Sequence, residues 1–232
     1  MLRKPATNLG SRIVNKPAGW TVKRATEAIE ELIDHLFREA FAIWVAESLF
    51  RKTDEEPCCA VVFYGCCLRV LDSMAEDAPL CVHWEAGRPT REMLAGNEHP
   101  KTFVKPDMTV TCGHRCTIKI EAKRLMTGKG LPKKYVQEGM RRFIDGKYSS
   151  TAGKPGYMLG FVVRGDTDKV AIAINKAIEA ESDLGANDQL GALTVPCDRF
   201  TRFESAHVGE IRLIHNFLDI RLTARHASLV HP

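Results

Sequence analysis

Two acidic residues and a lysine carry the clearest potential for chemistry in this sequence. Thirteen residues separate Asp107 from Glu121, and Lys123 follows two positions after Glu121. Two carboxylates that come together repel each other unless a cation lies between them. Carboxylate oxygens are the ligands that hard cations such as Mg²⁺ and Mn²⁺ prefer. A metal ion beside an ammonium group is suited to phosphodiester hydrolysis, because the ion polarises a phosphoryl oxygen and activates a water molecule.

The segments around residues 113–115 predict a β-hairpin that brings these groups together. Residues 104–112 and 116–124 alternate between apolar and polar side chains, and a three-residue loop with Gly113 joins them. Only one register places apolar residues opposite apolar residues, and it pairs Cys112 with Cys116, Val110 with Ile118 and Met108 with Ile120. Asp107 then faces Glu121, with Cβ atoms about 5 Å apart. Lys123 extends from the same face of its strand.

The elements that must position this hairpin follow from periodicity. Helical spacing of apolar residues predicts a long amphipathic helix over residues 21–50. Further helices are predicted over 133–148 and 167–181, strands over 58–70, 80–85, 157–163 and 210–220, and irregular chain over 86–100 and 182–197. This order predicts a mixed α/β fold with a central mixed β-sheet flanked by helices.

Composition is typical of a folded domain. The chain has 232 residues, of which 44% are hydrophobic and 27% charged, which excludes a chain that is disordered throughout. We expect an N-terminal arm over residues 1–20 and a single domain over 21–232. The N-terminus lacks the apolar core of a signal peptide, and no apolar run has the length of a membrane span. We therefore expect a cytoplasmic protein without a membrane partner.

Positive charge is concentrated around the hairpin. Residues 101–147 contain 12 Lys and Arg against 4 Asp and Glu, whereas the remainder has 21 basic and 25 acidic residues. Such an uneven distribution suits a polyanion held over one face of the protein. The alternative is a solvated helix face, and charge alone does not separate the two.

The hairpin and its surroundings resemble the PD-(D/E)xK signature of the restriction endonuclease-like nucleases. The resemblance covers residues 100–165: Pro106-Asp107, the thirteen-residue gap, Glu121-Ala122-Lys123, a basic helix and a hydrophobic strand. It implies that Asp107, Glu121 and the backbone carbonyl of Ala122 bind Mg²⁺ or Mn²⁺, and that Lys123 is the catalytic lysine.

The resemblance also implies an acidic residue from the first helix. Glu47 is our candidate, because a helical wheel over residues 22–49 places it within the apolar stripe, and a buried glutamate must be paired, protonated or metal-bound. Glu31 is the second choice. Gln137 is a candidate to lie near the metal, as in several branches of the superfamily, although Arg141 stands where some of these branches carry a tyrosine. Phosphate contacts are expected from Lys129, Lys133, Lys134, Arg141 and Arg142.

The sequence thus predicts a metal-dependent nuclease, an endonuclease more than an exonuclease, with double-stranded DNA as the expected substrate. We expect a homodimer or a subunit of a larger complex, and restriction, recombination and anti-phage defence all suit this fold. The alternative is a non-catalytic nucleic-acid-binding or scaffold protein with the same fold.

A zinc site is the main competing interpretation of the same hairpin. Cys112, His114 and Cys116 provide three candidate ligands within five residues, and Cys81 and His83 would have to complete the site. A hairpin tip explains Cys112 and Cys116 more simply, because no second Cys/His pair follows at the usual spacing. The eight cysteines are expected to be reduced.

Overall fold

The computed structural model describes most of the chain as one sheet with helices on both faces. It describes residues 22–49, 55–74, 79–85, 105–112, 116–128, 130–148, 154–197 and 199–221. The expected arm over residues 1–20, the loop at 113–115 and the whole irregular segment 86–100 therefore lie outside the described residues.

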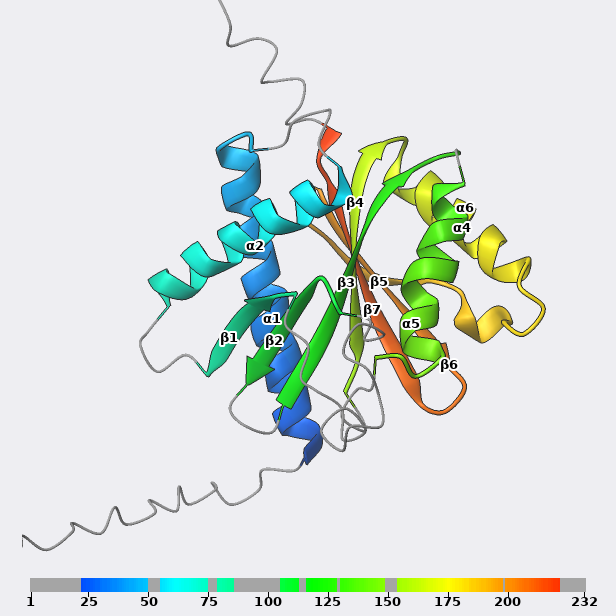
Figure 1. Ribbon diagram of the computed structural model, residues 1–232, viewed down its shortest axis with the longest axis horizontal. Coiled ribbons are helices and arrows are strands. Elements are labelled where there is room, and N and C mark those ends of the chain that lie inside the picture. The colour runs from blue at the N-terminus through cyan, green and yellow to red at the C-terminus, as the bar shows by residue number, and fades with distance from the viewer. Residues whose placement is uncertain are drawn as a thin grey trace, which may run out of the picture.

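The sheet contains seven strands within the described residues, in the order β1-β2-β3-β4-β7-β6-β5 (Figure 1). β1, β2 and β3 are antiparallel to one another, β4 is parallel to β3 and β7 to β4, and β6 and β5 are added antiparallel. The strands are Leu80–Trp84 (β1), Met108–Cys112 (β2), Cys116–Met126 (β3), Gly156–Arg164 (β4), Gly191–Cys197 (β5), Phe200–His207 (β6) and Ile211–Asp219 (β7). The predicted mixed α/β class is confirmed.

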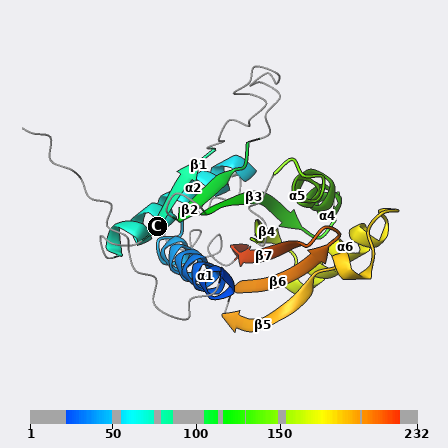
Figure 2. The same cartoon turned by 90° about the horizontal axis from the view of Figure 1, so that it is seen from below.

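The helices form a layer on each face of the sheet, as the view from below shows (Figure 2). Helices α1 (Val22–Ala46) and α2 (Glu56–Ser73) cover one face and share a hydrophobic core with it. The other face carries a continuous helical segment made of α4 (Leu131–Lys134), the π-helix η2 (Tyr135–Met140) and α5 (Arg141–Ile144), together with α6 (Thr167–Glu179). Connections from β3 to β4 and from β4 towards β7 run through this second layer.

One predicted strand is wrong, because residues 58–70 belong to helix α2. The run from Cys58 to Leu71 is almost continuously apolar, and in such a run the periodicity does not distinguish a strand from a buried helix. Its buried positions have helical spacing, and Pro57 lies in the first turn, where a missing backbone N–H costs nothing. The buried residues are Cys59, Ala60, Phe63, Cys66, Cys67 and Val70.

Three further elements differ from the prediction. The segment expected to be irregular contains the 3₁₀-helix η3 (Ala186–Asp188) and strand β5, and β6 follows it. The inward positions of β6 include Ser205 and His207, so apolar–polar alternation does not mark this strand.

Alternation along β3 decides which groups face which layer. Ile118, Ile120 and Ala122 pack in the core beneath α1 and α2. Glu121, Lys123 and Leu125 are the intervening residues, and Leu125 belongs to the second core beneath the α4–α5 segment. The predicted chemical groups of β3 are therefore covered by the basic helix that follows them in sequence.

Candidate active site

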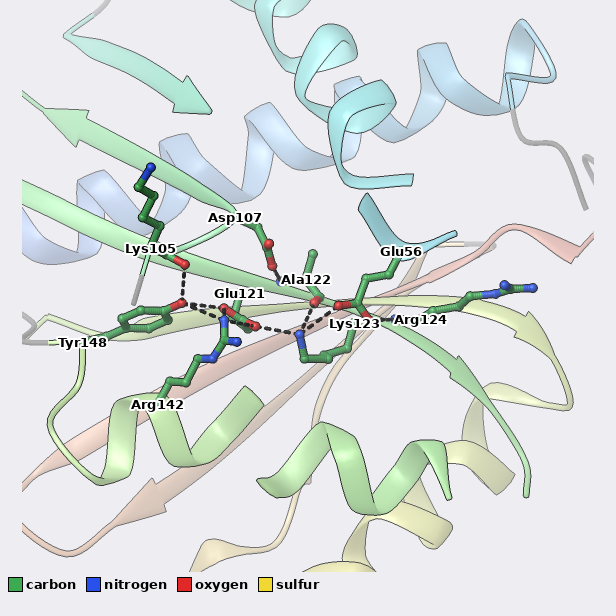
Figure 3. A network of polar contacts seen from close by, with 9 residues as sticks. All are labelled: Glu56, Lys105, Asp107, Glu121, Ala122, Lys123, Arg124, Arg142 and Tyr148. Carbon is green, nitrogen blue, oxygen red and sulfur yellow. Dashed lines mark hydrogen bonds and ion pairs between the residues drawn. The ribbon is translucent and has the colours of Figure 1, made fainter. Parts of the chain in front are cut away.

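The predicted hairpin register is confirmed, and it brings Asp107 to β3. Met108 pairs with Ile120, Val110 with Ile118 and Cys112 with Cys116. Asp107 directly precedes β2, and its Oδ2 accepts a hydrogen bond from the backbone N–H of Ala122 at 2.7 Å (Figure 3).

Asp107 and Glu121 are close enough to interact through their charges. Burial, followed by the negative charge of Glu121, raises the pKa of Asp107 to about 6, although the Ala122 N–H and the charge of Lys123 oppose the shift. Asp107 is therefore partly desolvated and lies within the electrostatic influence of Glu121.

Glu121 is fully buried and surrounded by donors. Its Oε1 accepts hydrogen bonds from Arg142 Nη1 and Lys123 Nζ, both at 2.6 Å. Its Oε2 lies 2.7 Å from Arg142 Nη1 and 2.7 Å from the Tyr148 hydroxyl. Tyr148 is also 2.9 Å from the Lys105 carbonyl oxygen, which ties the network to the segment that precedes Asp107.

Lys123 connects strand β3 to helix α2. Its Nζ donates to Glu121, to the Ala122 carbonyl at 2.9 Å and to Glu56 Oε1 at 2.9 Å. Burial alone would lower the pKa of Lys123, but the charges and hydrogen bonds of Glu121 and Glu56 raise it above its ordinary value. Lys123 is therefore a protonated ammonium group at neutral pH, which donates hydrogen bonds and does not act as a base.

Glu56 is the acidic residue that the sequence analysis missed. It lies in the first turn of α2, and its Oε2 accepts from the backbone N–H of Arg124 at 3.0 Å while Oε1 accepts from Lys123. An acidic residue followed by proline is typical of a helix N-terminus. That signal was present in the sequence but was hidden by the strand predicted over residues 58–70.

The structure places Glu47 outside the network around Glu121. It lies just beyond the end of α1, is exposed, and its carboxylate accepts from Arg69 Nη1 and Nη2 at 2.7 and 2.6 Å. The hydrogen bonds of Arg69 lower the pKa of Glu47. The helical wheel failed because the helix ends at Ala46. The second choice, Glu31, is exposed on α1.

Gln137 and Arg141 are also placed differently from the expectation. Gln137 is exposed, and its side-chain amide donates to Glu181 Oε1 at 2.8 Å, so it does not join the network around Glu121. Arg141 forms ion pairs with Asp183 and Glu181, residues that follow α6. Its charge is thereby neutralised by acidic groups of this chain.

The remaining candidates divide into three groups. Arg142 contacts Glu121, as described above, and is not a free surface cation. Lys133 and Lys134 are exposed on α4. Lys129 and the zinc candidate His114 lie outside the described residues. Within the described ranges, no three or more His, Cys, Asp or Glu side chains gather into a cluster that could hold a metal ion.

The α4–α5 segment approaches the sheet closely at one point. A Cβ atom on Gly139, in the π-helix, would lie 2.6 Å from the Met158 side chain and 3.5 Å from Lys123 Cγ. Glycine therefore lets the helix pass the Met158 side chain of β4, while Lys123 Cγ would be at ordinary van der Waals distance.

In comparisons with protein-family models, curated proteins and solved structures, nothing matches this chain. Among the helices that the structure describes, none is both long and apolar enough to cross a membrane. The function must therefore be inferred from the chain's own residues.

Proposed function

We propose that this chain is a metal-dependent nuclease that hydrolyses phosphodiester bonds in double-stranded DNA, with a restriction endonuclease-like core. The observation that supports this function best is that Asp107 binds the backbone of Ala122, the residue between Glu121 and Lys123, while the Lys123 ammonium binds Glu121. Strands β2 and β3, a basic helical segment and parallel strand β4 follow in the order that the PD-(D/E)xK resemblance implies.

The donor set fits a hard divalent cation. Asp107, Glu121 and the Ala122 carbonyl provide only oxygen ligands, which suit Mg²⁺ or Mn²⁺. When bound, such an ion supplies Lewis-acid polarisation of a phosphoryl oxygen and a water of lowered pKa. The raised pKa of Asp107 reflects burial and charge repulsion, and a cation at this position would relieve the repulsion.

The chain's own residues supply the rest of the chemistry. The Lys123 ammonium lies against Glu121 and the Ala122 carbonyl, so its positive charge can offset the charge that develops on the phosphoryl group. Glu56 holds Lys123 from the opposite side. Lys133 and Lys134 are available to contact backbone phosphates and position the duplex without reading its sequence.

The decisive experiment is cleavage of plasmid DNA with Mg²⁺, Mn²⁺ or EDTA by the wild type and by Glu121→Gln and Lys123→Met. We expect cleavage that needs the cation and falls at least about 100-fold in both variants. Glu39→Gln and Lys169→Met are matched controls, because both residues are exposed on helices away from the site, and they should cleave normally. Cleavage that survives in both site variants would reject this active site.

One observation favours a second function, a nucleic-acid-binding protein that does not cut. Arg142, Lys123 and Tyr148 already satisfy Glu121 without a metal ion. A binder of this kind would retain duplex in EDTA and cleave under none of the tested conditions.

A further inference from the structure

Both oxygens of Glu121 are already in contact with donors of this chain, and the single Tyr148 proton is shared between Glu121 and the Lys105 carbonyl. A carboxylate offers about four lone-pair positions, and each oxygen of Glu121 already has two donors within 2.7 Å. A cation that binds Glu121 must therefore displace one of these donors. The identity of the displaced donor determines what allows the cation to bind.

Two of the three donors are held in place. The Lys123 side chain is 9% exposed and is fixed by Glu56 and the Ala122 carbonyl. Tyr148 is buried, and its ring packs edge-on against Phe143 with ring centroids 5.0 Å apart. Moving Lys123 would break its hydrogen bonds to Glu56 and the Ala122 carbonyl, and moving Tyr148 would break its packing against Phe143.

Arg142 is the donor that can leave. Its side chain is 29% exposed, and every hydrogen bond it makes within the described part of the chain uses Nη1. Nε and Nη2 make no hydrogen bond with the described residues, and they are not buried. The other edge of the guanidinium is thus open to solvent, and it has the planar two-nitrogen geometry that binds a phosphate in bidentate fashion.

We infer that Arg142 is a substrate-operated latch on Glu121: a DNA phosphate draws the guanidinium away, and Glu121 becomes free to bind the divalent cation. This inference rests on the proposed nuclease function and adds its regulation. The cation and the duplex both bind better when Arg142 has left Glu121. Each must therefore strengthen the binding of the other by the same factor. The site is then assembled only on DNA, and the free protein keeps Glu121 neutralised.

Arg141 offers a matched control. It is the adjacent residue on α5 and carries the same charge, but its ion-pair partners are Asp183, Glu181 and Asp145. Arg141→Met therefore removes one positive charge from the same helix without releasing Glu121. Arg142→Lys is a second informative variant, because it keeps a cationic donor for Glu121 but lacks the two-nitrogen edge.

The latch is tested by the affinity of the full chain for Mn²⁺, measured by electron paramagnetic resonance of free Mn²⁺, with and without a short phosphorothioate duplex. Binding to the duplex alone is subtracted. For the wild type and Arg141→Met we expect weak binding that the duplex tightens about tenfold. Arg142→Met should bind Mn²⁺ tightly without DNA and gain little from the duplex. Arg142→Lys should bind weakly in both conditions.

The outcomes separate the latch from the nuclease. Equal Mn²⁺ affinities for Arg142→Met and Arg141→Met, or duplex coupling that persists in Arg142→Met, would overturn the latch while leaving the nuclease proposal intact. Should Arg142→Met not fold, coupling in Arg142→Lys equal to that of the wild type would overturn it. Absence of Mn²⁺ binding by every protein, with or without duplex, would reject the metal site and the latch together.

Discussion

Burying Glu121 is unfavourable by itself, because an ionised carboxylate loses its hydration and recovers it only through excellent partners. Arg142, Lys123 and Tyr148 provide those partners. Apolar residues of similar volume would often stabilise such a site equally well. Stability alone therefore does not account for the network.

A second buried network lies on β6 and β7 and has a structural role. Burial lowers the pKa of His207. The neutral ring fits its two contacts when Nδ1 donates to Asp188 and Nε2 accepts from the Ser205 hydroxyl. His215 Nε2 then donates to Ser205 Oγ, and its Nδ1 accepts from Tyr135. The order Asp–His–Ser is that of a hydrolase triad, but Ser205 is 2% exposed and lies between both imidazoles, so it has no free side for attack on a substrate.

The buried His215 predicts an acid-sensitive stability. Burial, followed by the nearby His207, lowers the pKa of His215 to about 3, from 6.5 in the unfolded chain. As pH falls below 6.5, His215 binds a proton in the unfolded state but not in the folded state. The free energy of unfolding therefore decreases between pH 6.5 and about 3. We expect His215→Gln, which keeps a donor and an acceptor, to reduce this loss by about 1 kcal/mol per pH unit.

Urea unfolding from about pH 7 to about pH 4 measures this dependence. His83→Gln is the control, because His83 is exposed at the edge strand β1, and it should retain the wild-type slope. An unchanged slope in His215→Gln would show that another group is responsible for the acid sensitivity.

Among the helices and strands, α2 connects the two layers at the site through Glu56. Its carboxylate holds Lys123 Nζ and the backbone N–H of Arg124. We expect Glu56→Gln to lower the cleavage rate about 10- to 100-fold, because Lys123 loses a counter-charge that positions it. The melting temperature should change little, since the Glu56 side chain is 34% exposed.

The neighbouring Glu55→Gln is the matched control, because Glu55 is exposed and makes no side-chain cap hydrogen bond. Single-turnover cleavage rates and thermal melting curves compare the two. Equal rates for Glu56→Gln and the wild type would remove Glu56 from the site.

The hairpin was predictable because its strands alternate strictly, and one register alone buries Val110, Ile118 and Ile120 on the same face. Helix α2 was not predictable by the same signal, since its residues are apolar on nearly every side. The partners of Glu121 could not be predicted from the sequence either. Arg142 and Tyr148 lie 21 and 27 positions away, and their approach depends on how the α4–α5 segment packs over β3.

Across the chain as a whole, the local excess of positive charge overstates the surface available to a polyanion. Arg141 is neutralised by acidic residues outside the basic segment, and Lys123 and Arg142 are committed to Glu121. Sequence counting does not detect such pairing. Lys133 and Lys134 are among the exposed cations of this segment.

These two lysines predict a measurable salt dependence. Replacing Lys133 or Lys134 by Gln should weaken duplex binding equally for unrelated sequences. Each substitution that removes an ion pair with a phosphate should also reduce the slope of log K against log salt by about 1. Fluorescence anisotropy over a range of NaCl concentrations measures this slope. Arg69→Gln removes a charge from α2, beside Glu47, and should leave the slope unchanged; equal slopes in all variants would exclude a phosphate role for the lysines.

The nuclease proposal requires Asp107 and Glu121 to share one divalent cation beside Lys123. An anomalous difference map from crystals soaked in Mn²⁺ together with a bound phosphorothioate duplex would locate that cation. We predict a peak about 2.1 Å from carboxylate oxygens of both residues, with Arg142 withdrawn from Glu121. A peak at Cys112 and Cys116, or a fully bound duplex with no peak between the two carboxylates, would contradict the shared metal site.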